Sequence, residues 1–92
     1  MIRIAVCDDD PAAIENIETC LDQISEYSFD YDVFFDGAEL LKYLQHSHTE
    51  YDIYMLDIEM KHMDGLTFAK ELRLFDTRAL IIFITGYSKY VY

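Results

Sequence analysis

Three carboxylates in this chain stand where they could do chemistry together. Asp8 and Asp9 directly follow the first apolar run of the sequence, Asp57 follows the third, and Thr85 ends the fourth with a hydroxyl. Carboxylates without a basic residue nearby in sequence suit a hard divalent cation, because Mg²⁺ prefers oxygen ligands. An aspartate beside such a metal can also attack a phosphoryl group and form an acyl phosphate. These residue types point to magnesium-dependent phosphoryl transfer if the fold brings them together.

Apolar runs typical of buried strands alternate with stretches of helical periodicity. The run at residues 2–7 is mostly apolar, and apolar residues then recur every three or four positions, as in an amphipathic helix. The predicted strands are residues 2–7, 31–35, 53–56 and 79–85. The predicted helices are residues 11–25, a stretch after Asp36, a stretch after Asp64 and the start of a fourth at 87–92.

The order β-α-β-α-β-α-β predicts one α/β domain over residues 1–92. Its sheet is expected to be parallel with helices on both faces, because parallel neighbours need helical crossovers. In such sheets ligands bind at the carboxyl ends of the strands, near the point where the strand order reverses. If the first and third strands are neighbours, Asp8, Asp9 and Asp57 meet at that edge, with Thr85 beside them.

Other aspartates at element boundaries are expected to cap helices rather than to bind a ligand. Asp10 precedes Pro11, which suits the first helical position, so Asp10 is predicted to be an N-cap. Asp36 with Glu39 three positions later resembles a capping box, and Asp64 also precedes a predicted helix. The acidic cluster at the start of the chain is thus predicted to combine a metal site with a helix cap.

The composition limits the partners and the compartment. The 92 residues carry a formal net charge of −11, which argues against a nucleic-acid or anionic-membrane surface. We recognise neither a signal peptide nor a membrane span, and we expect Cys7 and Cys20 to be buried thiols, so a cytoplasmic location is predicted. His46 and His48 are two residues apart and share no helix face, and His62 is distant in sequence, which argues against a histidine metal site.

Three motifs in sequence order resemble the receiver domain of two-component response regulators. They are "IAVCDDDP", "MLDIEMKHMDGL" and "IIFITGY", at the ends of the first, third and fourth predicted strands. The resemblance spans nearly the whole chain. It implies a flavodoxin-like doubly wound sheet of order 2-1-3-4 and a histidine kinase as phosphodonor. The style of the first two motifs is similar to receivers attached to LytTR-type DNA-binding output domains.

The resemblance also implies a role for each site residue. Asp57 matches the phosphoacceptor, Asp8 and Asp9 match the acidic pair that holds Mg²⁺, and the backbone carbonyl of Glu59 matches a further metal ligand. Thr85 matches the switch hydroxyl that reaches the phosphoryl group. The expected result is a signalling phosphoacceptor that switches an output domain, not a turnover enzyme.

The chain departs from the pattern of these receivers in two places. Lys61 stands where many receivers have proline, so the loop after Asp57 is expected to be looser or to differ in charge. The chain also ends before the fifth strand and final helix of such domains, and their site lysine and aromatic switch residue have no counterpart here. We therefore expect a fragment that is phosphorylated more weakly. Its open fourth strand is expected to be able to pair with another copy.

Two alternative functions stay open at this stage. A magnesium-dependent phosphatase could use an aspartyl phosphate, although phosphatases of the haloacid-dehalogenase type usually need Asp-x-Asp, whereas this chain has Asp57-Ile58-Glu59. A pseudo-receiver would act only as a protein-interaction module. The intact set of three carboxylates argues against it.

Overall fold

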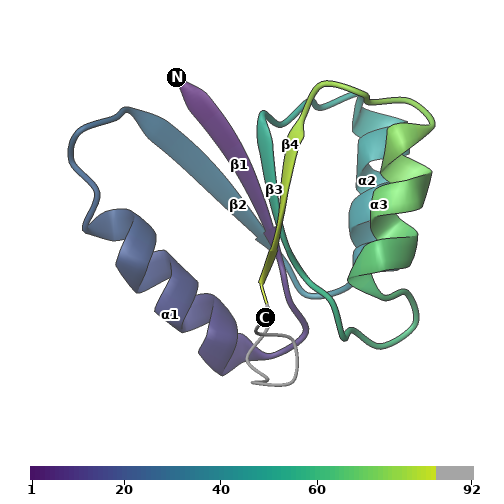
Figure 1. The fold of residues 1–92 in the computed structure, drawn as a ribbon, viewed down its shortest axis with the longest axis horizontal. Helices are drawn as coiled ribbons and strands as arrows, with labels where there is room; N and C mark the ends of the chain where they lie inside the picture. The colour runs from purple at the N-terminus through teal and green to yellow at the C-terminus, as the bar shows by residue number, and fades with distance from the viewer. Residues whose placement is uncertain (85–92) are drawn as a thin grey trace.

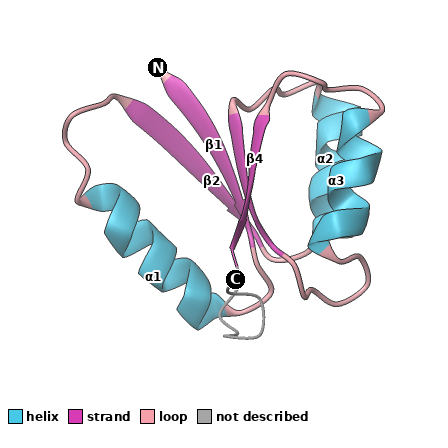
Figure 2. Ribbon diagram, viewed as in Figure 1, coloured by secondary structure: helices cyan, strands magenta, loops and turns pink. Residues whose placement is uncertain are grey.

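Four parallel strands form one sheet with helices on both sides. The computed structural model describes residues 1–84, so Thr85 and the predicted fourth helix lie outside the described residues. The strands run in the order β2-β1-β3-β4, which confirms the expected flavodoxin-like topology (Figures 1 and 2). The elements are β1 (Ile2–Cys7), α1 (Pro11–Asp22), β2 (Phe29–Phe34), α2 (Gly37–Ser47), β3 (Ile53–Asp57), α3 (Gly65–Arg73) and β4 (Leu80–Ile84).

The core is divided by the sheet into two layers. Helix α1 covers one face, and α2 and α3 lie together on the other (Figure 1). Side chains of β1 alternate between the layers: Ala5 and Cys7 pack towards α2 and α3, whereas Ile4 and Val6 pack towards α1. These four side chains are all buried, and β1 lies between β2 and β3 in the sheet. The strand therefore fixes the position of Asp8 and Asp9, which follow Cys7.

The three predicted N-caps are confirmed. Asp10, Asp36 and Asp64 each accept a hydrogen bond from a backbone N–H in the first turn of the following helix, at 3.0, 2.8 and 2.7 Å. Such a bond satisfies one of the N–H groups that have no partner inside the helix. These three aspartates therefore determine where α1, α2 and α3 start.

Several element boundaries differ from the sequence prediction, and two of them differ by two residues or more. Helix α1 ends at Asp22 rather than near residue 25, and Ile24 beyond it is 42% exposed. Strand β2 starts at Phe29 rather than at residue 31, because Phe29 pairs with Ile2 at the start of β1. The pairing partner, not the local apolar pattern, sets the start of this strand.

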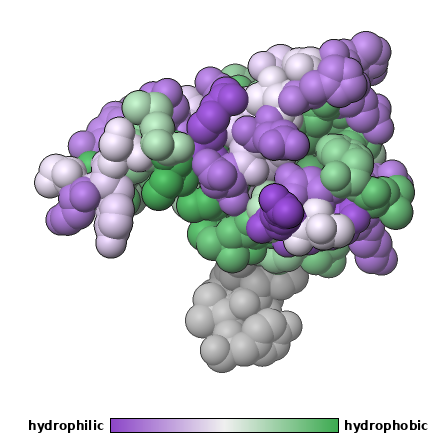
Figure 3. Space-filling view, turned by 90° about the horizontal axis from the view of Figure 1, so that it is seen from above, coloured by the Kyte–Doolittle hydropathy of each residue, from purple (hydrophilic) through white to green (hydrophobic). Residues whose placement is uncertain are grey.

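Apolar surface remains between α1 and the sheet. Seen from above, apolar residues show in the middle of the molecule and again on its right side (Figure 3). A hollow of about 230 Å³ is lined by Ile2, Ile4, Leu21, Ile24, Tyr27, Phe29, Ile53, Met55 and Ile82. Strand β4 is one of the two edges of the described sheet, and its Leu80 and Phe83 are exposed. Pairing of this edge with another copy stays a prediction.

None of the helices in residues 1–84 has the length and apolar character needed to cross a bilayer.

The two cysteines have different surroundings, so the prediction that both are buried is wrong for one of them. Cys7 is buried in β1, but Cys20 is exposed. Helix α1 buries Ile14 and Leu21, and Cys20 is rotated about 100° away from Leu21 around the helix axis. A cysteine next to an apolar position in the sequence thus faces solvent.

This difference predicts selective thiol labelling. In the folded protein, one thiol should react quickly with Ellman's reagent, and the second should react only after denaturation. Burial raises the pKa of the Cys7 thiol to about 12, so little of the reactive thiolate is present there. Cys20→Ser should abolish the fast phase and Cys7→Ser should keep it. Fast labelling of both thiols in the native protein would contradict this arrangement.

Candidate functional site

Three carboxylates from two distant parts of the sequence meet at the carboxyl ends of β1 and β3. The strands are neighbours, with Cys7 opposite Leu56, so the residues that follow Cys7 lie beside Asp57. One oxygen atom from each of Asp8, Asp9 and Asp57 lies within 4.8 Å of the other two. The convergence expected from the order of the strands is therefore present. Within residues 1–84, this aspartate trio is the group that could hold a metal ion, and no histidine belongs to it.

The trio is partly removed from water, which makes its negative charge unfavourable. Asp8 is only 4% exposed, and its Oδ1 accepts the backbone N–H of Asp10 at 2.9 Å. Burial, reinforced by the charge of Asp8, raises the pKa of Asp57 to about 6, although the backbone N–H of Glu59 counteracts part of this rise. Burial also raises the pKa of Asp8. A bound cation would relieve both effects, and the all-oxygen donor set fits Mg²⁺.

Asp9 is held by the loop that follows β3. The backbone N–H of Lys61 donates to Asp9 Oδ2 at 2.9 Å. A proline at this position has no N–H to donate. The departure at Lys61 therefore supplies a hydrogen bond to a candidate ligand. The non-proline residue was visible in the sequence, but its contact with Asp9 was not.

The same loop borders an open hollow beside the trio. The hollow has a volume of about 520 Å³, and Asp9, Glu59 and Lys61 are among the residues that line it. Glu59 lies two residues beyond Asp57, so its backbone is on the loop next to the acidic site. That its carbonyl binds metal stays a prediction. Of the trio, Asp9 is the member that lines this hollow.

Gly65 allows α3 to start directly against the backbone of Asp57. The N–H of Gly65 donates to the carbonyl oxygen of Ile58 at 2.9 Å. A Cβ atom at position 65 would overlap the carbonyl oxygen of Asp57 and would lie 3.2 Å from the Cα of Ile58. The glycine is therefore required for close approach, and it fixes α3 relative to the candidate phosphoacceptor.

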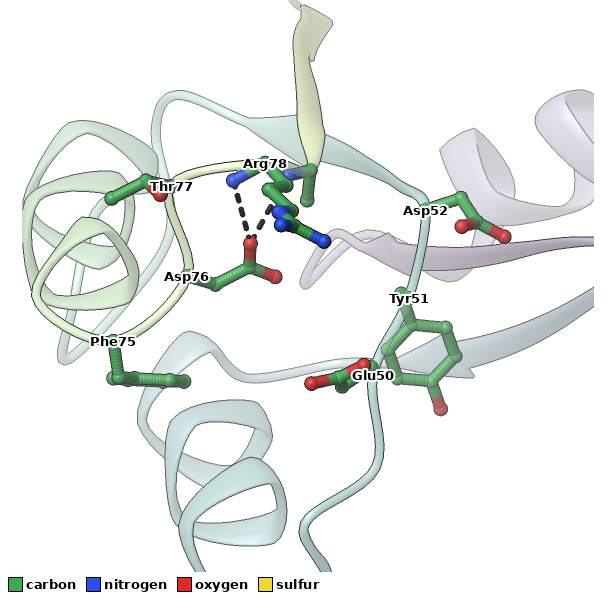
Figure 4. A pocket seen from close by; sticks show the side chains of 8 residues that line it. Glu50, Tyr51, Asp52, Phe75, Asp76, Thr77 and Arg78 are labelled. Carbon is green, nitrogen blue, oxygen red and sulfur yellow. Dashed lines mark hydrogen bonds between the residues drawn. The ribbon is translucent and has the colours of Figure 1, made fainter.

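A different hollow lies at the opposite end of the strands. It has a volume of about 420 Å³ and is bordered by residues that precede β3 and β4 (Figure 4). Asp76 Oδ1 accepts the backbone N–H groups of Arg78 at 2.9 Å and Ala79 at 3.1 Å. Asp76 thus closes the turn between α3 and β4, and this hollow is remote from the trio.

Comparison with known proteins identifies the family. The family model for the response regulator receiver domain matches residues 4–92. The chain belongs to this family. The match includes position 85, which the sequence resemblance assigned to the switch hydroxyl and which lies outside the described residues.

Curated relatives of this receiver domain include regulators of transcription. The transcription factor SKN7 of Candida albicans is 34% identical over 70 residues, which cover 76% of this chain and 12% of that protein. The transcriptional regulatory protein YpdB of Escherichia coli is 26% identical over 89 residues, which cover 97% of this chain and 35% of that protein. The receiver domain therefore spans about a third or less of the length of these relatives.

Solved structures agree with the fold. The response regulator TrrA of Thermotoga maritima, determined in complex with Mg²⁺-BeF, is 37% identical and superimposes with a TM-score of 0.80, covering 99% of this chain and 75% of that one. The response regulatory domain of MrkE from Klebsiella pneumoniae is 26% identical with a TM-score of 0.78, covering 96% and 70%. These matches confirm the receiver fold across the described elements.

Proposed function

We propose that this receiver domain accepts a phosphoryl group on Asp57 from a histidine kinase, in a Mg²⁺-dependent reaction. The observation that carries the proposal is the convergence of Asp8, Asp9 and Asp57, with oxygen atoms within 4.8 Å of one another. Asp8 and Asp9, together with Asp57 and the backbone carbonyl of Glu59, would hold the metal. The Mg²⁺-BeF complex of the relative TrrA supports this assignment.

The reaction requires little of the protein beyond positioning and charge neutralisation. A carboxylate oxygen of Asp57 forms a bond to phosphorus, the bond from phosphorus to the donor imidazole nitrogen breaks, and that nitrogen keeps the electron pair. When bound, Mg²⁺ would neutralise negative charge shared between the phosphoryl oxygens and the carboxylates. The N–H of Glu59 holds the Asp57 carboxylate, and the hydroxyl of Thr85 would then bind the phosphoryl oxygens. The product is an acyl phosphate on Asp57 and not a released product, so the domain acts as a switch rather than as a turnover enzyme.

We further propose that phosphorylation controls an output domain in a longer cytoplasmic protein. The named relatives are a transcription factor and a transcriptional regulatory protein, and this domain spans only part of each. The output is therefore proposed to bind DNA, with the LytTR type favoured by the sequence motifs. The receiver itself, at a net charge of −11, is proposed to bind neither nucleic acid nor membrane.

Phosphorylation in vitro tests the proposed function. Incubation with Mg²⁺ and acetyl phosphate should add the mass of one phosphoryl group to this chain and to the full-length protein that contains it. Asp57→Asn should reduce the modification at least about 100-fold, because the nucleophile is lost. The matched control is Asp30→Asn, which changes an exposed aspartate of β2 and should leave the modification unchanged. Modification that persists in Asp57→Asn would contradict the site, and steady phosphate release from an ester would indicate a phosphatase instead.

A further inference from the structure

The loop between β3 and α3 contains a strained turn next to the acidic site. His62 has a φ of +66°, in the left-handed region that residues other than glycine seldom adopt. The backbone N–H of Met63 donates to the carbonyl oxygen of Lys61 at 2.7 Å, which closes a three-residue turn around His62. A γ-turn with a positive φ is rare and strained. It persists only where the surrounding contacts hold it in place.

One such contact joins the turn to the start of α2. The Nδ1 atom of His62 lies 2.8 Å from Oδ2 of Asp36, which is 26 residues away in sequence. The Asp36 side chain is only 20% exposed, and its other oxygen caps α2 by accepting the N–H groups of Ala38 and Glu39. The hydrogen bond from His62 holds the pKa of Asp36 below its usual range. Asp36 is therefore a fixed anchor for the imidazole.

The turn transmits this anchoring to the acidic site through the residue before His62. The N–H of Lys61 is the group that donates to Asp9 Oδ2. On the other side of the turn, the carbonyl oxygen of Met63 lies close to Gly37, where an added Cβ would meet it at 3.1 Å. The loop is thus held against α2 on one side and bonded to Asp9 on the other.

We propose that His62 is a positioning residue for the metal site: bonded to Asp36, it holds the strained turn that keeps the Lys61 N–H on Asp9. The inference deepens the proposed function, since it concerns the same aspartate trio. Partners that orient a metal ligand typically change metal affinity by about 10–100-fold when they are removed. Because the His62 side chain is 74% exposed, we expect the low end, a loss of about 10-fold.

Substitutions at both ends of the His62–Asp36 contact test the proposal. His62→Asn keeps a residue type that tolerates a left-handed backbone but is too short to reach Asp36. Asp36→Ser keeps an oxygen for the α2 cap but removes the second oxygen, which contacts His62. Each should weaken Mg²⁺ binding about 10-fold in a calorimetric titration of the 92-residue chain. The double variant should bind no more weakly than either single variant, because the two residues act through one contact. His46→Asn is the matched control, since His46 is exposed and its Nδ1 lies 2.8 Å from the carbonyl oxygen of Lys42 in its own helix.

The Lys61 amide gives a second measurement that needs no metal. In metal-free protein, its proton resonance should move upfield in His62→Asn and Asp36→Ser, as its bond to Asp9 weakens, and stay in place in His46→Asn. His62→Gly relieves the backbone strain and should remain folded, yet show the same upfield shift and the same loss of Mg²⁺ affinity. An unchanged amide resonance and unchanged affinity in folded His62→Asn and His62→Gly would overturn the proposal. If the wild-type chain failed to bind Mg²⁺, the proposed function would fail, whereas the metal-free amide shift would still decide whether His62 positions Lys61.

Discussion

Replacement of Gly65 by alanine is expected to lower both the stability of the domain and its affinity for Mg²⁺. The added Cβ would overlap the carbonyl oxygen of Asp57, which is backbone and cannot rotate away. Either α3 or the end of β3 must then move, and overpacking of this kind typically costs about 1–3 kcal/mol. Because a domain of this size changes its Tm by about 4–8 °C per kcal/mol, the loss should be plain in a thermal melt followed by circular dichroism. A Mg²⁺ titration should show weaker binding, because the backbone that carries Asp57 is displaced.

Gly37→Ala provides the matched control for this substitution. Its added Cβ would lie 3.1 Å from the carbonyl oxygen of Met63 and 3.4 Å from the terminal methyl of Met60, which is a flexible side chain. Neither glycine has a positive φ, so the comparison reports on space and not on backbone conformation. We expect Gly37→Ala to lose distinctly less Tm than Gly65→Ala, because the closest contact of its Cβ is a tight approach and not an overlap. An unchanged Tm in Gly65→Ala would show that α3 does not start against Asp57.

Addition of Mg²⁺ is expected to stabilise the domain strongly at pH 7.5 and much less at pH 5. At a free concentration of 100 times Kd, a ligand that binds only the folded state adds about 2.7 kcal/mol. For this size of domain, that corresponds to a rise in Tm of about 10–20 °C. Removal of the metal with a chelator should reverse the rise. Thermal melts at both pH values, with and without Mg²⁺, measure the effect.

The sign of the pH dependence follows from Asp57. Its pKa in the folded state is raised to about 6 from 3.8, so the folded protein binds this proton more tightly than the unfolded chain. The stability that this proton contributes is fully present below pH 3.8 and is lost as pH rises through about 6. In metal-free protein at pH 7.5, repulsion between the ionised carboxylates of the trio therefore lowers the stability, and bound Mg²⁺ would remove that repulsion. At pH 5, the proton competes with the metal.

Other carboxyl groups change the stability with pH in the direction opposite to Asp57, so a control variant is needed to separate their effect. Hydrogen bonds lower the pKa of Asp36 and Asp64, and the stability they contribute is lost as pH falls through those lowered values. Asp8→Asn removes one charge of the trio and leaves both caps in place. It should raise the Tm of metal-free protein at pH 7.5 and abolish most of the Mg²⁺-dependent rise. Equal Tm values with and without Mg²⁺ in the wild type would contradict a metal site.

The sequence predicted those features that depend on local chemistry or on a single topological rule. The N-caps at Asp10, Asp36 and Asp64 were predictable because a cap acts within three residues of itself. The meeting of Asp8 with Asp57 was predictable because parallel strands bring their carboxyl ends to one edge. Assignment of roles to these residues came from the family resemblance.

Features that depend on tertiary geometry were missed. The contact between Lys61 and Asp9 spans 52 residues, and that between His62 and Asp36 spans 26, so no local pattern encodes either. Both also lie at a turn whose positive φ at His62 ordinary backbone preferences disfavour. The exposure of Cys20 was missed for a simpler reason. Cys20 and Leu21 are adjacent in sequence, but the rotation of α1 about its axis decides which of the two side chains faces the core. The start of β2 at Phe29 was missed because pairing with Ile2 sets it and the strand's own apolar residues do not.

The pairing of β1 with β3 also decides when the acidic site can come into existence during folding. The site joins Asp8 and Asp9 near the start of the chain to Asp57 and Lys61 far along it, and a helix-strand-helix segment must be closed between them. Contacts of such long sequence separation are slow to form because loop closure must precede them. A cation bound there would stabilise a part of the structure that is assembled late. Its effect would then appear mainly as slower unfolding, so the ion would prolong the lifetime of the native domain more than it would speed its formation.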